Sequence, residues 1–287
     1  MMLGDKFMFK IISKRYLNDT VCEMKIYAPL VAKKAEAGEF IILRVDEEGE
    51  RIPLTIAGYD RDAGWVKIIF QIVGATTILL GEKQEGETIA DFVGPLGNAT
   101  RVEGLKNVCV VGGGVGCAIA LPVAEKLNSI GANVTSIVGF RNEGLVILED
   151  EFKASSKEFV LTTDDGSKGE KGNVCIPLER MLESGKQFDE IIAIGPLVMM
   201  KFVVLTAKKY NVPCTVSMNP IMIDGTGMCG GCRLSVGGKV KFACVDGPDF
   251  DGYEVDFDEA IWRSSMYKQE EEKDREKTCN LFGKEVK

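Results

Sequence analysis

Histidine does not occur among the 287 residues of this chain. Its absence excludes Ser-His-Asp triads, imidazole general bases, and metal or haem sites with an imidazole ligand. Long hydrophobic runs are missing as well, because the longest apolar run, Val108 to Ala124, has 17 residues and contains four glycines and a proline. A membrane-spanning helix needs about 20 apolar residues, so no membrane span is predicted.

Excess positive charge is also lacking. The chain carries 35 Lys and Arg against 43 Asp and Glu, a net charge of −8, whereas nucleic-acid binding needs concentrated basic side chains. A secretory signal is not expected, because the charged residues Asp5 and Lys6 stand where its apolar segment would begin. The nine cysteines are scattered, except for three between residues 229 and 244. This usage predicts a cytoplasmic protein with one metal-type cysteine cluster, no disulfide framework and no nucleic-acid partner.

The first hundred residues predict an antiparallel β-barrel. Short apolar runs separated by Gly, Asp and Asn are typical of strands in a small barrel or sandwich. The expected strands are Phe7–Arg15, Val21–Ala28, Phe40–Val45, Leu54–Ala57 and Trp65–Val73, and Phe92–Gly97 is expected to end the region as a turn.

From Asn107 onward, strands and helices are expected to alternate, which predicts an α/β domain with a parallel sheet covered on both faces. The expected strands are Val108–Val111, Val134–Gly139, Phe159–Thr163, Ile191–Ile194 and Cys214–Met218, and the expected helices are Ala118–Asn128, Glu149–Ser155, Leu178–Leu182 and Val198–Lys209. After Asn219-Pro220 the chain becomes rich in Gly and Cys, and Lys268–Lys277 is a nearly fully charged tail, either a solvated or frayed helix or a docking arm. The predicted domains are therefore residues 1–100, 101–219 and 220–287.

The clearest local motif is Asp224-x4-Cys229-x2-Cys232-x11-Cys244. Plant-type 2Fe-2S sites use Cys-x4-Cys-x2-Cys and a more distant fourth cysteine, and a carboxylate at the first position can still ligate iron. Gly225, Gly227, Gly230 and Gly231 would let the loop close around an iron pair. The alternatives are a zinc knuckle with three Cys and one Asp, or three unrelated buried thiols.

A second motif is the glycine run Val111–Gly116, placed between an expected strand and an expected helix. Glycines at such a turn let a dinucleotide pyrophosphate approach the N–H groups at the start of the helix. Gly195-Pro196 is a second glycine turn after a strand. Close packing of helix on strand is the alternative explanation for these glycines.

In this order, the barrel, the glycine-turn domain and the cysteine loop resemble the ferredoxin-reductase-like electron-transfer subunits. One branch is the dihydroorotate dehydrogenase electron-transfer subunit. Another is the small subunit of NADH-dependent ferredoxin:NADP oxidoreductase, also described as the sulfide dehydrogenase beta subunit. Asp224 is similar to the second branch, which has a three-Cys, one-Asp cluster where the first has four cysteines.

The resemblance implies a flavin-binding barrel, a nucleotide-binding α/β domain and a C-terminal iron–sulfur loop, with FAD, NAD(H) and a 2Fe-2S cluster as cofactors and no catalytic side chain. The family's Arg-Pro-x-Ser signature falls on Ile52–Thr55, so the arginine position holds Ile and Arg51 stands one residue early. The implied cofactor-binding residues are Pro53, Leu54, Thr55, Phe70, Gln71, Ile72, Gly74, Thr76 and Thr77 for the flavin, and Gly113, Gly114, Gly116, Gly195, Pro196 and Met199 for the nucleotide.

Arg141, directly after an expected strand, stands where an acidic residue would hold the ribose of NAD. Taken alone it favours NADP, as a partner of the 2′-phosphate, or serves as a surface charge or pyrophosphate contact. The resemblance instead implies NAD(H) on this subunit. It also implies a larger partner subunit with a second flavin and 4Fe-4S clusters, in a heterodimer that couples NADH, ferredoxin and NADP by electron bifurcation. The alternatives are a dihydroorotate dehydrogenase electron-transfer subunit and a zinc-stapled nucleotide-binding regulator.

Overall fold

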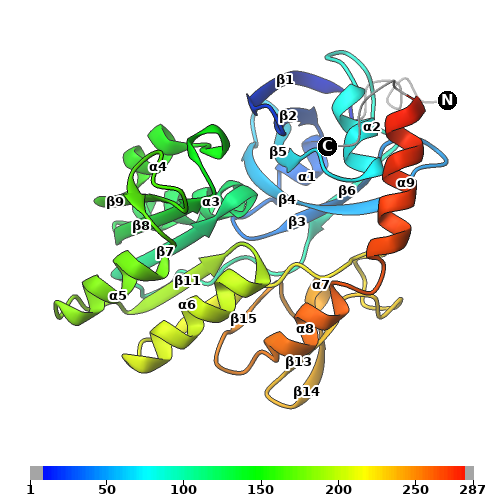
Figure 1. Ribbon diagram of the computed structural model, residues 1–287. Coiled ribbons are helices and arrows are strands. Elements are labelled where there is room, and N and C mark those ends of the chain that lie inside the picture. The colour runs from blue at the N-terminus through cyan, green and yellow to red at the C-terminus, as the bar shows by residue number, and fades with distance from the viewer. Residues whose placement is uncertain (1–8, 282–287) are drawn as a thin grey trace.

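A computed structural model of the chain describes residues 9–281 (Figure 1). Within these residues the N-terminal region forms a six-stranded antiparallel sheet in the order β1-β2-β5-β4-β3-β6. The strands are β1 (Ile11–Asn18), β2 (Val21–Tyr27), β3 (Phe40–Arg44), β4 (Arg51–Asp60), β5 (Trp65–Gln71) and β6 (Asp91–Leu96). The sheet curls around a core that includes Met24, Ile41 and Phe70. This confirms the predicted barrel-like layer, although the edge strands β1 and β6 do not pair with each other in the described part.

Two details of the barrel differ from the sequence prediction. Phe92–Gly97 was expected as a turn, but most of it forms β6, so that prediction is wrong. Pro95 fits there because β6 is an edge strand that pairs only with β3, and proline is tolerated where one side of a strand is unpaired. The short helices α1 (Pro29–Ala32) and α2 (Ala75–Glu82) were not predicted. Of the expected first strand, residues 7 and 8 lie outside the described residues.

The second layer is the predicted α/β domain. Its sheet has the order β10-β9-β8-β7-β11-β12-β15. The strands are β7 (Asn107–Gly113), β8 (Asn133–Phe140), β9 (Glu158–Thr163), β10 (Glu170–Lys171), β11 (Glu190–Ile194), β12 (Cys214–Ser217) and β15 (Asp249–Asp251), and all pairings are parallel except that of β15 with β12. The carboxyl ends of β7, β8 and β11 therefore meet at one edge.

Helices cover both faces of this sheet, as expected for a parallel sheet. They are α3 (Cys117–Ser129), α4 (Glu149–Ser155), α5 (Cys175–Glu183) and α6 (Leu197–Lys209). Val108 and Val110 of β7 pack in one core with α3 and α4, whereas Cys109 and Val111 pack in the other core with α5 and α6. This alternation along one strand explains why its sequence is apolar at every position.

The C-terminal segment is more structured than the predicted loop. It contains a hairpin of β13 (Arg233–Val236) and β14 (Lys239–Phe242), then α7 (Ala243–Asp246), β15, α8 (Phe257–Arg263) and α9 (Lys268–Leu281). The charged tail is the helix α9, which packs beside α2 of the barrel and buries Thr278 and Cys279 (Figure 1). Within residues 9–281, none of the helices has the length and apolar character needed to cross a membrane.

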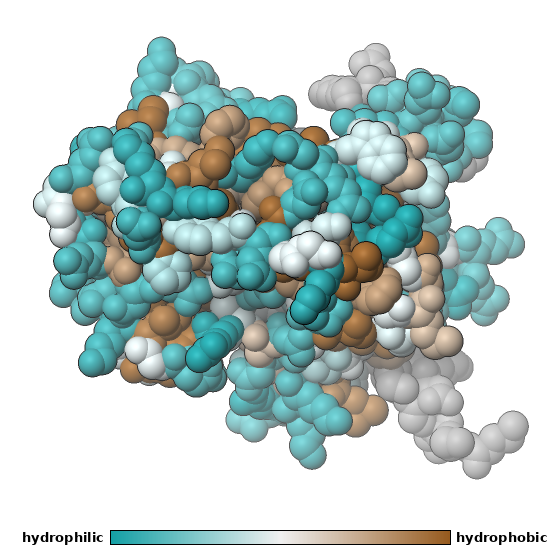
Figure 2. Space-filling view, turned by 90° about the horizontal axis from the view of Figure 1, so that it is seen from below, coloured by the Kyte–Doolittle hydropathy of each residue, from teal (hydrophilic) through white to brown (hydrophobic). Residues whose placement is uncertain are grey.

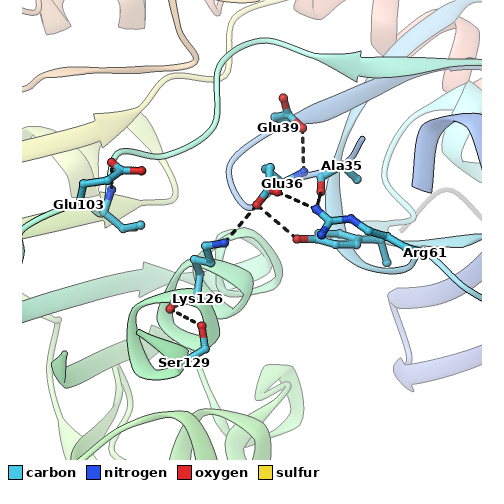
Figure 3. Close-up of polar contacts among 9 residues, drawn as sticks. Ala35, Glu36, Glu39, Arg61, Glu103, Lys126 and Ser129 are labelled. Atoms are coloured by element: carbon cyan, nitrogen blue, oxygen red, sulfur yellow. Dashed lines mark hydrogen bonds and ion pairs between the residues drawn. The ribbon is translucent and has the colours of Figure 1, made fainter. Parts of the chain in front are cut away.

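A polar contact ties the barrel to the α/β domain (Figure 3). Glu36 lies in the connection between α1 and β3. Its carboxylate accepts hydrogen bonds from Arg61 Nη2 at 2.6 Å and from Lys126 Nζ of α3 at 3.3 Å. Burial raises the pKa of Glu36, but the hydrogen bonds from Arg61 and Lys126 outweigh it and lower the pKa. These side chains are partly exposed, so the contact contributes less than about 1 kcal/mol and chiefly orients α3 toward β4.

Candidate functional site

The segment between β12 and β13 carries the first three predicted cluster ligands. Asp224 Oδ1 accepts a hydrogen bond from the Thr226 N–H at 2.9 Å, and Oδ2 accepts one from the Cys229 N–H at 2.7 Å. The bond from Thr226, helped by that from Cys229, lowers the pKa of the Asp224 carboxyl, so it is ionised at neutral pH. Left-handed backbone occurs at Gly225, Gly227 and Gly230, with φ of 76°, 80° and 69°. Three of the four loop glycines thus have left-handed backbone, whereas Gly231 does not.

The remaining donors are a buried pair and an exposed thiol. Cys232 Sγ donates to Cys244 Sγ of α7 at 3.3 Å, and both residues are buried. Burial, followed by the hydrogen bond from Cys232, raises the pKa of the Cys244 thiol to about 12. Metal binding would have to displace this proton, since thiolates are the ligands. Cys229 is exposed, and the Gly231 N–H donates to its sulfur at 3.5 Å.

The donors fall into two pairs. Among residues 9–281, no three His, Cys, Asp or Glu side chains gather as a site for one metal ion. A 2Fe-2S cluster takes two protein ligands at each iron. Cys232 and Cys244 lie together, and Asp224 is joined to Cys229 through the Cys229 N–H. The assignment of these four ligands stays a prediction.

The cluster loop rests against the barrel, a contact that the sequence did not reveal. A Cβ on Gly225 would lie 2.7 Å from Leu96 Cδ1 and 3.0 Å from Ile42 Cδ1, so only glycine lets the loop approach β3 and β6 this closely. Arg51 Nε of β4 donates to the Ile223 carbonyl oxygen at 2.8 Å. In Figure 1 the segment after β12, in yellow, runs beneath the barrel strands. The predicted flavin strand and the predicted cluster loop are therefore neighbours.

The residues predicted to hold the flavin lie on β4, at the end of β5, and at the start of α2. Pro53, Leu54 and Thr55 are half-buried on β4, whereas the Phe70 side chain lies in the barrel core, so a flavin could contact only its backbone. Gln71 ends β5 and Ile72 follows it.

At the start of α2, the threonine hydroxyls already have protein partners. Thr77 Oγ1 accepts from the Gly74 N–H at 3.0 Å and donates to the Gly74 carbonyl oxygen at 2.9 Å, and Thr76 Oγ1 donates to Glu50 at 3.1 Å. A Cβ on Gly74 would meet nothing within 4 Å. The groups open to a phosphate here are the first N–H groups of α2, which have no partner within the helix.

The glycine turns of the α/β domain pack closely at three glycines and leave open space at a fourth. A Cβ on Gly113 would lie 2.2 Å from Met199 Sδ, and a Cβ on Gly116 would lie 2.7 Å from Gly195 Cα. These three glycines let the turns after β7 and β11 pack together. Gly114 differs, because its φ is 55° and nothing lies within 4 Å of a Cβ there. Gly114 thus faces open space beside the N-terminus of α3.

Acidic residues that the sequence analysis missed lie near Arg141. The Asp164 N–H donates to the Phe140 carbonyl oxygen at 3.0 Å, and the Asp165 N–H donates to that of Arg141 at 3.3 Å. Hydrogen bonds from Ser167, chiefly from its hydroxyl, lower the pKa of Asp165. These acidic residues follow β9, whereas an acidic residue that holds the ribose was expected directly after β8.

Comparison with known proteins places this architecture in a family. Residues 219–256 match the model of the iron-sulfur cluster binding domain of dihydroorotate dehydrogenase B. The dihydroorotate dehydrogenase B (NAD(+)) electron transfer subunit of Geobacillus thermodenitrificans is 33% identical over 254 residues, covering 85% of this chain and 96% of its own. A homolog of that subunit from Thermotoga maritima is 44% identical over 281 residues, covering 98% and 99%. The chain belongs to the family of dihydroorotate dehydrogenase B electron-transfer subunits.

Within this family of electron-transfer subunits, one solved structure is similar to the chain over nearly its whole length. A chain of the NADH-dependent reduced ferredoxin-NADP oxidoreductase, a protein studied for flavin-based electron bifurcation, superposes with a TM-score of 0.90 at 43% identity and covers 96% of this chain and 99% of its own. The predicted fold class and the two-branch resemblance are thereby confirmed. The cofactors implied by the resemblance, FAD, NAD(H) and an iron–sulfur cluster, are confirmed at the level of the family and its fold.

Proposed function

We propose that this chain is the small subunit of a bifurcating NADH-dependent ferredoxin:NADP oxidoreductase. It would oxidise NADH at the barrel and pass electrons through a 2Fe-2S cluster to a larger flavin and 4Fe-4S subunit in a cytoplasmic heterodimer, with ferredoxin reached through the complex. When bound, FAD supplies the exchange between two-electron and one-electron chemistry. The main support for the proposal is that the cluster loop contacts β4, the strand predicted to bind the flavin, and has Asp224 at its first predicted ligand position.

The residues of the chain then have positioning roles. The open side of Gly114 and the N-terminus of α3 would hold the nucleotide pyrophosphate, and the start of α2 would hold that of the flavin. At the carboxyl ends of β7 and β11, the nicotinamide ring of the nucleotide would face the barrel. The ion pair of Lys126 with Glu36 connects α3 to the barrel. Histidine is not needed, because the side chains bind and orient the cofactors.

Exposed apolar side chains near the cluster loop support a partner subunit. Figure 2 shows brown apolar areas among the polar surface on the face seen from below. The exposed large apolar residues of the C-terminal segment are Ile221, Ile223, Met228, Val240, Val245, Trp262, Met266 and Tyr267. Of these, Ile221, Ile223 and Met228 lie on the cluster loop itself, where a partner subunit would cover them.

The decisive experiment is purification with the co-purifying partner, followed by a visible spectrum and metal analysis. We expect a yellow-brown complex in which this chain holds one FAD and one iron pair, and whose flavin is bleached by NADH. A colourless chain that contains zinc would instead support the nucleotide-binding regulator. A cluster-bearing chain that co-purifies with a dihydroorotate-oxidising subunit would support the other branch of the family.

The proposed preference for NADH is based on Asp164 and Asp165, whose backbone N–H groups bond the carbonyl oxygens of Phe140 and Arg141. Two carboxylates at the ribose end would repel a 2′-phosphate more than Arg141 alone attracts it. Replacing both by Asn should raise the ratio of kcat/KM for NADPH to that for NADH, by about tenfold. Steady-state flavin reduction with both nucleotides measures this ratio. Preference for NADPH in the parent protein would contradict the assignment and favour Arg141 as the phosphate partner.

A further inference from the structure

Arg51 is the first residue of β4, and Ile223 directly precedes Asp224. The bond from Arg51 Nε to the Ile223 carbonyl oxygen, 2.8 Å long, joins positions 172 residues apart. Among residues 9–281, none of the ion pairs involves Arg51. Its neighbour in register, Arg44 of β3, does have a carboxylate partner, because its Nε lies 2.6 Å from Asp91 Oδ2. The Arg51 guanidinium is thus held by its hydrogen bond to the cluster loop.

Several contacts place the loop on the barrel, and the Arg51 bond is the one that reaches the peptide directly before Asp224. Both carboxylate oxygens of Asp224 bind N–H groups of the loop itself, which sets its internal shape but not its place on the barrel. Met222 is buried in one core with Ile42 of β3 and holds this part of the loop on the barrel, whereas Ile221 and Ile223 on either side are 43% and 48% exposed. Gly225 contributes only van der Waals contact with Leu96 and Ile42. The hydrogen bond from Arg51 adds the polar contact that orients the Ile223–Asp224 peptide toward β4.

We propose that Arg51 is a positioning residue for the iron–sulfur site, holding Asp224 in register with the flavin strand. The inference rests on the proposed function, because it takes Asp224 as a cluster ligand. It also accounts for the shifted arginine: the family's flavin arginine position holds Ile52, and the side chain one residue earlier reaches the cluster loop instead.

Two physical consequences follow from this placement. Strand β4 begins at Arg51 and continues directly into Pro53–Thr55, the residues predicted to bind the flavin. Because a strand is rigid, the bond from Arg51 would keep Asp224 at a constant distance from these residues. The guanidinium also adds a fixed positive charge near a site of three thiolates and a carboxylate. Net charge and hydrogen bonding tune iron–sulfur potentials, so removing Arg51 should lower the potential of the cluster.

The test compares Arg51→Met, Arg51→Lys and the matched control Arg44→Met in the complete complex. For Arg51→Met we expect iron release to a chelator about tenfold faster, a lower cluster potential and a changed EPR signal of the dithionite-reduced protein, while FAD content stays that of the parent. Arg51→Lys, which keeps the charge and an N–H donor, should restore most of the parent behaviour. Arg44→Met should leave the cluster signals unchanged.

Loss of FAD with unchanged cluster signals in Arg51→Met would overturn the inference and make Arg51 a flavin ligand. Parent-like FAD and cluster signals, loss of both cofactors together, or an equal effect of Arg44→Met would overturn it as well. The proposed function fails separately, because its failure appears in the parent complex as an absence of the iron pair.

Discussion

Gly114→Glu is expected to abolish flavin reduction by NADH while the protein still accepts electrons from dithionite. Gly114 has nothing within 4 Å of a Cβ, so a larger side chain can be accommodated without displacing α3 or β7. Its carboxylate would then occupy the space of the pyrophosphate and oppose its charge. We expect NADH-dependent reduction, measured by stopped-flow bleaching of the flavin, to slow by more than about 100-fold, equivalent to about 3 kcal/mol.

The control for this variant is Gly114→Asn. Gly114 has a φ of 55°, and Asn adopts left-handed backbone more readily than other residues with a side chain. Asn should therefore share the backbone strain of the Glu variant without its charge, and we expect it to keep a much larger part of the NADH-dependent rate. Glu and Asn variants with equal, parent-like rates would mean that the glycine turn only packs helix on strand.

Much of the fold could be predicted because its elements carry local patterns. The apolar strand β7 followed by glycines and α3 is recognisable because a strand buried on both faces is apolar throughout. Helix α2 was missed because its sequence, ATTILLGE, contains β-branched residues that favour strands, and it packs against α9, about 200 positions later. Tertiary packing that spans such a separation leaves no local pattern.

The candidate site, too, could be predicted where its residues are close in sequence and not where they are far apart. The spacing of Asp224, Cys229 and Cys232 identified the cluster loop, because its ligands are close together in sequence. Two long-range contacts hold the segments that carry the predicted ligands. Arg51 bonds Ile223 of the cluster loop, and Asn98 Nδ2 bonds the Val245 carbonyl oxygen of α7 at 3.0 Å, in both cases across more than 140 positions. They involve backbone oxygens, which every residue has, so no residue type marks them in the sequence.

Asp224 gives the second large expected effect, because its carboxylate both shapes the loop and serves as a predicted ligand. Asp224→Ala removes the acceptors of the Thr226 and Cys229 N–H groups. It would also leave one iron of the predicted cluster with a single protein ligand. We expect its iron content to fall about tenfold or its cluster to be lost within the purification, since a lost hydrogen bond to a charged group alone is worth about 1.5–3 kcal/mol. Iron analysis and EPR of the reduced protein measure this loss.

Asp224→Asn and Asp224→Cys separate the two roles. Asn keeps one acceptor oxygen but not the charge, so its iron content should lie between those of the Ala variant and the parent. Cys supplies the thiolate of the four-cysteine branch, and it should assemble a full iron pair with a changed potential and EPR signal, because ligand identity and charge tune the cluster. If redox titration and EPR found Asp224→Ala and Asp224→Cys indistinguishable from the parent, another residue would be the fourth ligand. Cys279 would be tested first and Cys175 second, although they lie on α9 and α5, outside the cluster loop.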